Sequence, residues 1–487
     1  MQQRAPILAI AALAVAGLVA AACAQELTPL EQLGKILFFD TNLSTPPGQS
    51  CAACHAPEVG FTGPDETVNQ YLVVYHGAVP TRFGNRKPPT SAYGGQSPVL
   101  FYDEFEDLWI GGMFWDGRAT GWTLGDPLAE QAQGPFLNTL EQNNPNARQV
   151  VRKVSESSYA ELFEQVWGPG SLDPVHDVDG SYERIARSIA AYESSAEVNP
   201  FTSKYDYYLQ GLVDLTPQET WGLELYEGVA MCNACHLSEP GPNGEPPLFT
   251  DFTYDNLGIP RNEDLPFYSM PRKWNIEGYD WTDYGLGGFL ATVPDHADHA
   301  DANRGKHKVP TLRNVDQRPY PEFVKAYGHN GYFKSLEEIV HFYNTRDVED
   351  WPAPEVPENV NTDELGNLGL SPEAEAALVA FMRTLTDGYV LPAPRTVAPP
   401  ASVQLSAIQT GARGVAPQLA FKLPRDGDVR IEIFDVSGRR VATPVKGWYA
   451  AGEHRLNLPV DDLASGVYLA RLALGPQMST TKIAVIR

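Results

Sequence analysis

The pentapeptide Cys51-Ala-Ala-Cys54-His55 recurs far downstream as Cys232-Asn-Ala-Cys235-His236. Two thiols at this spacing can form thioethers to both vinyl groups of one haem, and the adjacent histidine can then bind the iron. A single copy would also suit a redox dithiol or half of a zinc site. Four of the five cysteines fall in the two copies, however, so no further C-x-x-C pair remains to complete a four-cysteine zinc site.

The two motifs therefore predict two covalently bound haem c groups. The predicted iron ligands are His55 and His236, as neutral imidazoles. The predicted cofactor-binding residues are Cys51, Cys54, His55, Cys232, Cys235 and His236.

A short amphipathic helix is predicted before each motif. Residues 27–40 have Thr28 as N-cap and Pro29 in the first turn, and residues 216–228 begin in the same way with Thr216 as cap. A helix followed by a haem motif thus occurs twice, which indicates a duplicated unit. We expect a mainly α fold with two cytochrome c-like haem domains, residues 25–205 and 206–390.

The first residues predict export from the cytoplasm. Arg4 precedes an apolar run over residues 7–19, and small residues follow, so residues 1–24 are typical of a secretory signal peptide cleaved before Gln25. Lipidation of Cys23 is the alternative. No later stretch approaches the roughly 20 apolar residues of a membrane-spanning helix. We expect a periplasmic protein, or a secreted or cell-surface one, without a transmembrane segment.

The formal net charge of −25 argues against nucleic acid as a partner, because an acidic surface repels phosphate. The same charge would attract a small basic electron carrier and raise its encounter rate. Acidity is also common in secreted proteins, so an ordinary solvated surface is the simpler interpretation.

The C-terminal part has a different pattern. Residues 391–402 form a proline-rich linker, and alternating apolar residues over 428–435, 454–458, 466–472 and 481–487 predict strands separated by Gly-containing turns. We expect residues 403–487 to form a small all-β, immunoglobulin-like sandwich. It contains no catalytic constellation, which favours a role as a handle or anchor.

Residues around the motifs resemble the bacterial di-haem cytochrome c peroxidase family, which includes the enzymes that mature methylamine dehydrogenase. The resemblance covers about residues 27–389 and is carried by LGKILFFD (33–40), GGMFWDGRA (111–119), QAQGPFLN (131–138), KVPTLRN (308–314) and SLEEIVHFYN (335–344). It implies two cytochrome c-like domains with the active site near their interface. The N-terminal haem would react with peroxide, and the C-terminal haem would store or relay an electron.

The resemblance also implies catalytic residues. The family's N-P-x-E-M segment corresponds to Asn138-Thr-Leu-Glu141-Gln142, so Glu141 is the predicted proton-transfer group at the first haem. A solvated loop carboxylate is the alternative for Glu141. Trp115 is predicted to lie between the haems as an oxidisable bridge, and packing against porphyrin is its structural alternative.

The far ligand of the second haem separates two branches of the family. Conventional peroxidases have methionine at the ninth position of the late helix, whereas the methylamine-dehydrogenase-maturing branch has tyrosine, and Tyr343 is ninth when Ser335 is counted as the first. A phenolate oxygen stabilises oxidised iron, so ligation by Tyr343 would favour the more oxidising branch. His341 is the rival ligand, and packing of Tyr343 in the helix core is the structural alternative.

Two further ligand predictions come from the same resemblance. His76, followed by glycine, occupies a loop that caps the first haem in resting conventional peroxidases; it either ligates the iron or leaves that face open. The family also holds a calcium ion between its domains through an asparagine and backbone carbonyls. At the matching place, Lys87 stands where asparagine is common and Asn85 lies two residues earlier.

The final domain resembles the C-terminal sorting domains of type IX secretion cargo. The segments FDVSGRR (434–440), AGEH (451–454), LASGVY (463–468) and KIAVIR (482–487) carry this resemblance. It implies recognition by secretion or surface-anchoring machinery. The alternative is a plain immunoglobulin-like domain that docks on the haem-binding part.

We therefore predict a di-haem c-type peroxidase that reduces hydrogen peroxide to water, with electrons relayed between the haems from a small donor such as a c-type cytochrome or a cupredoxin. One alternative is a protein-modifying oxidase that uses high-valent haems with a tyrosine axial ligand. The other is an electron-transfer cytochrome without peroxidase activity.

Overall fold

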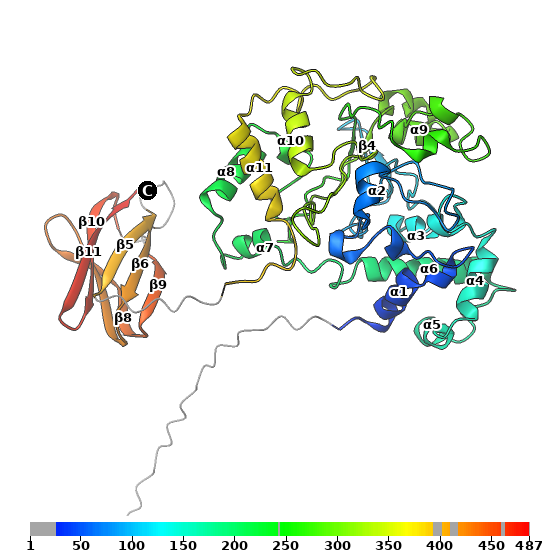
Figure 1. The fold of residues 1–487 in the computed structure, drawn as a ribbon. Helices are drawn as coiled ribbons and strands as arrows, with labels where there is room; N and C mark the ends of the chain where they lie inside the picture. The colour runs from blue at the N-terminus through cyan, green and yellow to red at the C-terminus, as the bar shows by residue number, and fades with distance from the viewer. Residues whose placement is uncertain (1–25, 242–243, 393–401, 410–416, 459–462, 487) are drawn as a thin grey trace, which may run out of the picture. The chain divides into compact units, whose positions relative to one another are not determined.

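The chain forms two compact units, residues 1–390 and 391–487 (Figure 1). The computed structural model describes residues 26–241, 244–392, 402–409, 417–458 and 463–486. The predicted signal peptide, Cys23 and most of the predicted linker lie outside the described residues. No described helix is both long and apolar enough to cross a membrane.

The first unit consists of helices joined by long loops. Its helices are α1 (Pro29–Phe39), α2 (Glu66–Tyr71), α3 (Pro127–Leu137), α4 (Ala147–Ser155), α5 (Ala160–Trp167), α6 (Val178–Glu193), α7 (Lys204–Leu209), α8 (Pro217–Glu227), α9 (Gly285–Leu290), α10 (Leu336–Thr345) and α11 (Pro372–Arg383). Two short antiparallel pairs lie between them: β1 (Phe101–Asp103) with β2 (Leu108–Ile110), and β3 (Tyr254–Asp255) with β4 (His307–Lys308).

Helices α1 and α8 begin in the same way, as their sequences predict. Thr28 and Thr216 each accept a hydrogen bond from the backbone of a glutamate three residues on, and that glutamate's side chain accepts one from the cap residue's backbone. A proline occupies the first helical position in both cases. Downstream of each helix, a turn of 3₁₀ helix contains the first three residues of the haem motif, Cys51–Ala53 and Cys232–Ala234.

Both helices cross a later helix at very short range: α1 packs on α6, and α8 packs on α11. A Cβ atom placed on Gly34 would lie 1.8 Å from the Ser188 carbonyl oxygen, and one on Gly222 would lie 2.0 Å from the Ala377 carbonyl oxygen. Only glycine lets the two backbones approach this closely. The repeated crossing shows that two halves of the unit share one local architecture. The first half contains α1 to α6 and the second contains α7 to α11.

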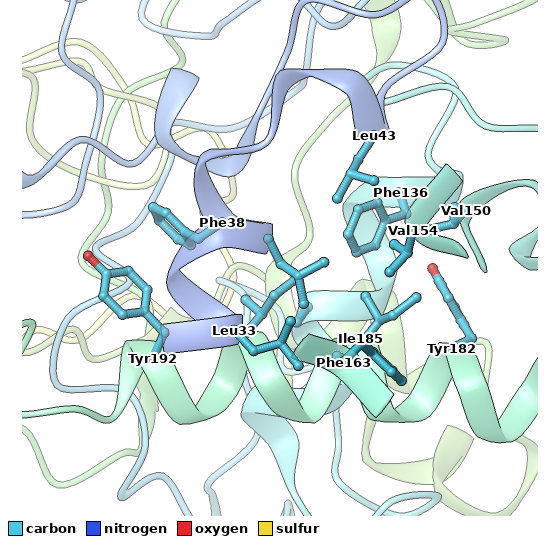
Figure 2. Close-up of a cluster of buried hydrophobic side chains, with 14 of the residues drawn as sticks. Leu33, Phe38, Leu43, Phe136, Val150, Val154, Phe163, Tyr182, Ile185 and Tyr192 are labelled. Atoms are coloured by element: carbon cyan, nitrogen blue, oxygen red, sulfur yellow. The ribbon is translucent and has the colours of Figure 1, made fainter. Parts of the chain in front are cut away.

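Each crossing lies within its own hydrophobic core. Around α1 and α6, the buried side chains include Leu33, Phe38, Ile185 and Tyr192, and Figure 2 shows them with residues from α3, α4 and α5. Around α8 and α11, the second core includes Tyr226, Phe249, Phe342 and Phe381. Burial of side chains of this size stabilises the fold by about 1.5–3 kcal/mol each. The loops that carry the haem motifs are thereby anchored to two rigid helix pairs.

The C-terminal unit is all β. Its strands are β5 (Gln404–Gln409), β6 (Gln418–Leu423), β7 (Gly427–Phe434), β8 (Arg440–Tyr449), β9 (Gly452–Asn457), β10 (Gly466–Leu474) and β11 (Gln477–Val485). One antiparallel sheet has the order β11-β10-β7-β8 and the other the order β5-β6-β9. Residues of both sheets, among them Leu419, Phe421, Ile431 and Leu472, share one core.

Strands β5, β6 and β8 were not among the predicted strands. Pro444 and Gly447 interrupt the sequence of β8, and the structure accommodates them because β8 lies at the edge of its sheet, where a missing backbone donor costs little. In β6 the buried and partly buried positions alternate, so a period-two signal was present there.

Substitution of Gly222 by alanine is expected to lower the melting temperature of the haem-loaded protein, because the new methyl group would push α8 away from α11. Overpacking of this kind costs about 1–3 kcal/mol. Thermal unfolding followed by circular dichroism measures the effect. Gly84→Ala is the matched control, because the nearest atom to its added Cβ is 3.9 Å away; equal melting temperatures for both variants would contradict the proposed close approach.

Candidate functional site

The histidine of the first motif is held by a backbone carbonyl. Nδ1–H of His55 donates to the Phe61 carbonyl oxygen at 3.2 Å, and burial lowers the pKa of His55 to about 4. The ring is therefore neutral at physiological pH. Since Nδ1 carries the proton, the lone pair of Nε2 is free to bind iron.

The second motif repeats this arrangement. Nδ1–H of His236 donates to the Phe249 carbonyl oxygen at 2.9 Å, and burial lowers the pKa of His236 as well. Phe61 and Phe249 both have a φ angle of +55°, a conformation that is uncommon for a bulky residue. The same strained turn thus directs one carbonyl at each motif histidine.

A large cavity adjoins the second motif. Its empty volume is about 1590 Å³, part of which is open to solvent, and it extends from the second motif to residues of the first half of the unit. Cys232, Cys235, His236, Tyr343 and Trp115 are among the lining residues. Two thiols and a free imidazole nitrogen at a cavity of this size fit a covalently bound haem.

Tyr343 in α10 lines this cavity together with His236. Burial, followed by the nearby Cys232, raises its pKa, and no described residue makes a hydrogen bond to its hydroxyl. His341 lies elsewhere on the helix: its two ring nitrogens are 3.0 Å and 3.2 Å from carboxylate oxygens of Glu375 and Glu349. Of the two rival ligands, Tyr343 is therefore the one that faces the cavity.

Glu141 lies beside the first motif. It follows α3 in a tight turn, and the Asn138 side-chain amide donates to its Oε1 at 2.8 Å. Burial raises the pKa of Glu141, against the opposing effects of Arg118 and Asn138. Burial and then the Glu141 carboxylate raise the pKa of the Cys54 thiol to about 12. The structure thus brings this carboxyl group from a distant loop to the first haem motif.

The His76 loop packs directly on the turn that contains Glu141. The backbone N–H of Ala78 donates to the Glu141 carbonyl oxygen at 2.7 Å, and a Cβ on Gly77 would lie 2.5 Å from the same oxygen. The Gln49 amide donates to the His76 carbonyl oxygen at 3.1 Å. The His76 side chain itself is exposed, and its Nδ1 lies 2.8 Å from the Gly77 carbonyl oxygen.

Trp115 is held where the two halves meet. Its indole Nε1–H donates to the Lys87 carbonyl oxygen at 2.8 Å, and its own carbonyl oxygen accepts from the backbone N–H of Lys308 at 2.9 Å. The side chain is only 9% exposed and lines the cavity. Its position is therefore fixed by residues from both halves of the unit.

Sequence reasoning missed a buried polar network beside this tryptophan. The Arg86 guanidinium forms ion pairs at 2.6 Å with Asp116 and Asp283. Next to Asp283, the rings of His307 and His329 stack at 3.5 Å with an interplanar angle of 8°. Ligand atoms of these two histidines and Asp283 lie within 4.8 Å of one another, but stacked parallel rings cannot both point their nitrogens at one ion. No motif joins these residues in the sequence.

The place predicted for calcium is occupied by a lysine. The Lys87 ammonium donates to Thr62 Oγ1 at 3.0 Å and to the Pro88 carbonyl oxygen at 3.1 Å. Calcium requires six to eight oxygen ligands, and a neighbouring ammonium group would repel it. The residues present therefore do not fit a calcium ion at this position.

Comparisons with known proteins support the resemblance. Residues 28–214 match the family model described as di-haem cytochrome c peroxidase. The methylamine utilization protein MauG of Paracoccus denitrificans is 35% identical over 386 residues, which cover 76% of this chain and 92% of that protein. The chain belongs to the di-haem cytochrome c peroxidase family. Two c-type haems follow from this membership, and the predicted family and enzyme class are confirmed.

Other similar proteins are also peroxidases. Cytochrome-c peroxidase IdrP2 of Denitromonas iodatirespirans is 27% identical, with 73% of this chain and 81% of that protein covered. The crystal structure of the diheme peroxidase BthA of Burkholderia thailandensis is similar with a TM-score of 0.61 and 31% identity, over 74% of this chain and 87% of that one. Residues 416–487 match the model of a secretion system C-terminal sorting domain, which confirms the predicted resemblance of the β domain.

Substitution of Tyr343 by methionine is expected to change the ferric absorption and electron paramagnetic resonance spectra of the second haem, because a phenolate oxygen would be replaced by a thioether sulfur. Its reduction potential is expected to rise. Tyr327→Phe is the matched control, since Tyr327 also lines the cavity but donates its hydroxyl to the Val315 carbonyl oxygen at 3.2 Å. A Tyr343→Met protein with the wild-type spectrum would exclude phenolate ligation.

Proposed function

We propose that this di-haem protein reduces hydrogen peroxide to water at the haem of the first motif. The observation that carries the proposal is the Glu141 carboxyl group, which lies half-buried beside Cys54 and whose pKa is raised by the loss of solvent around it. The overall reaction consumes two electrons and two protons for each peroxide and yields two waters. When bound, the haem supplies the iron at which peroxide binds and through which the electrons are delivered.

Glu141 is proposed to move the proton. As a carboxylate it accepts a proton from the near oxygen of peroxide and donates it to the far oxygen, which then departs as water. A raised pKa makes the group a stronger base than an exposed glutamate and so keeps both protonation states accessible. The hydrogen bond from Asn138 holds one carboxylate oxygen in place, and the positive charge of Arg118 limits the rise in pKa.

Trp115 is proposed to carry electrons between the haems. It lines the cavity that also contains His236, and its indole is fixed by the hydrogen bond to the Lys87 carbonyl oxygen. The electrons reach the second haem from a small donor protein. A basic c-type cytochrome or a cupredoxin suits the acidic chain, whose formal net charge is −25.

A second candidate function is oxidation of a protein substrate. The specific observation in its favour is Tyr343, whose unpartnered hydroxyl faces the cavity of the second motif. A relative named methylamine utilization protein is 35% identical to this chain. A third candidate, electron transfer without peroxide chemistry, gives no role to the half-buried carboxyl group of Glu141.

Domain roles and location complete the proposal. Residues 25–205 would form the peroxide-reacting domain and residues 206–390 the electron-relay domain, with axial ligands His55, His236 and Tyr343. The C-terminal β unit would be an immunoglobulin-like sandwich that directs the exported protein to the cell surface or the medium. Its match to a sorting-domain model supports this role.

Substitution Glu141→Gln is expected to slow the reaction with peroxide by about 10²–10⁴-fold, because an amide cannot accept the proton. The wild-type rate should rise with pH through an apparent pKa above 4.5, since the carboxylate form is the base, and the variant should lack this rise. Stopped-flow absorption measures both rates. Glu193→Gln is the control: this buried carboxyl has its pKa raised to about 8 and also acts on the Cys51 thiol. Equal slowing in both variants would contradict a specific role for Glu141.

The fully oxidised protein is expected to react with one equivalent of hydrogen peroxide without prior reduction. The reason is that the His76 side chain is exposed, and the ring contacts that the described residues give it, with Gly77 and Phe83, lie within its own loop. Soret and near-infrared absorption of the oxidised and half-reduced forms tests this. Reaction of only the half-reduced form would instead assign His76 as a ligand, and no reaction in either form would exclude both enzymatic functions.

A further inference from the structure

Three lysine side chains line the cavity between the halves without an acidic partner. Among the described residues, no carboxylate oxygen lies within 4.0 Å of the ammonium groups of Lys87, Lys308 or Lys325. They donate instead to backbone carbonyls and one hydroxyl. Lys308 also lies 5.2 Å from the rings of Phe252 and Tyr254, which provide cation–π contacts, whereas within the described parts of the chain Lys87 and Lys325 have no such contact.

Lys325 has the most complete oxygen shell. Its side chain is buried, and its ammonium donates to the carbonyl oxygens of Val59 at 3.0 Å, Asn314 at 2.9 Å and Gln317 at 3.1 Å. Val59 belongs to the first half of the unit and the other two residues to the second. The ammonium group thus joins the halves through an array of carbonyl oxygens of the kind that often binds a metal cation.

Lys87 also lies where the two halves meet, a region that we call the seam. Its backbone N–H donates to the His329 carbonyl oxygen at 2.8 Å, and its own carbonyl oxygen accepts from Trp115. Its ammonium group donates hydrogen bonds to Thr62 Oγ1 and to the Pro88 carbonyl oxygen. The charges of the two lysines are close enough that Lys87 contributes to lowering the pKa of Lys325. The oxygen atoms that a cation would need here are therefore already bonded to ammonium groups.

Buried cations without anions are costly, which indicates that an anion completes this seam. Burial lowers the pKa of Lys87 to about 8. Burial and then the charge of Lys87 lower the pKa of Lys325, and the negative charge of Asp316 opposes this only in part. Two like charges held together in a low-dielectric region repel each other unless a negative group lies between or beside them. Haem carries two carboxylate groups on flexible arms, and the haem of the second motif would fill this cavity.

We propose that Lys87 and Lys325 act as fixed cations at the seam between the haem-binding halves: they neutralise haem carboxylates, and the protein binds no calcium there. The proposal rests on the two haems that family membership implies, and it does not depend on peroxidase activity. Unlike a bound calcium ion, the ammonium group of a lysine side chain cannot be removed by a chelator. The positive charge beside the haems would therefore not depend on the supply of metal ions.

The test is a spectroelectrochemical titration of both haems in the haem-loaded full chain. Wild-type reduction potentials are expected to be the same in excess calcium chloride and in excess EGTA. Lys87→Met should shift at least one potential to more negative values, because loss of a nearby positive charge stabilises ferric iron. Lys325→Met should shift the reduction potential in the same direction. If this variant, at the more deeply buried lysine, fails to fold, Lys87→Met still provides the test.

Lys334→Met is the matched control. Its ammonium also joins the two halves, with hydrogen bonds to the carbonyl oxygens of Asn69 at 3.0 Å and Gly331 at 2.9 Å, but it does not line the cavity. Its potentials should equal those of the wild type. Wild-type potentials that respond to calcium or EGTA would overturn the proposal, and so would a Lys87→Met protein indistinguishable from Lys334→Met. Because peroxide is not added, the result stands whether or not the proposed peroxidase function holds.

Discussion

The hydrogen bond from each motif histidine to a phenylalanine carbonyl is the interaction on which the haem sites depend. It fixes Nδ1 as the protonated atom, so Nε2 is the nitrogen of His55 and of His236 that could bind an iron. The bond requires a left-handed backbone at Phe61 and Phe249, and such strain persists only where the surroundings enforce it. The crossing helix pairs and their two hydrophobic cores provide that support on each side.

The two halves share this scaffold but differ in the groups that lie beside their haem motifs. The first half brings a carboxyl group, Glu141, to its motif, and the second half brings a phenol, Tyr343. A carboxyl group can move protons, whereas a phenolate stabilises oxidised iron. The duplication thus supplies two similar haem motifs, and under the proposed function these loop and helix residues would give the two haems different chemistry. Trp115 and the lysines of the seam lie where those sites meet.

Much of the fold and of the haem chemistry could be predicted because it is encoded locally. The capping boxes of α1 and α8 lie within four consecutive residues, and each haem motif lies within five. Strand β8 was missed because Pro444 and Gly447 break its alternation, and only its edge position permits them. The calcium prediction came from the family resemblance alone. In the structure, the Lys87 ammonium donates hydrogen bonds to oxygen atoms that a calcium ion would need as ligands.

By itself, the sequence determined the number of haems, the family and the nature of the C-terminal domain, and it predicted the attachment residues, since each depends on short contiguous motifs. Only the tertiary structure decided which residues lie near the haem motifs and the cavity. Glu141 meets Cys54, Lys325 reaches Val59, and His307 stacks on His329 although no motif links the members of any pair. Burial and charge act through space, and the closely crossing helices at Gly34 and Gly222 set which distant loops share that space.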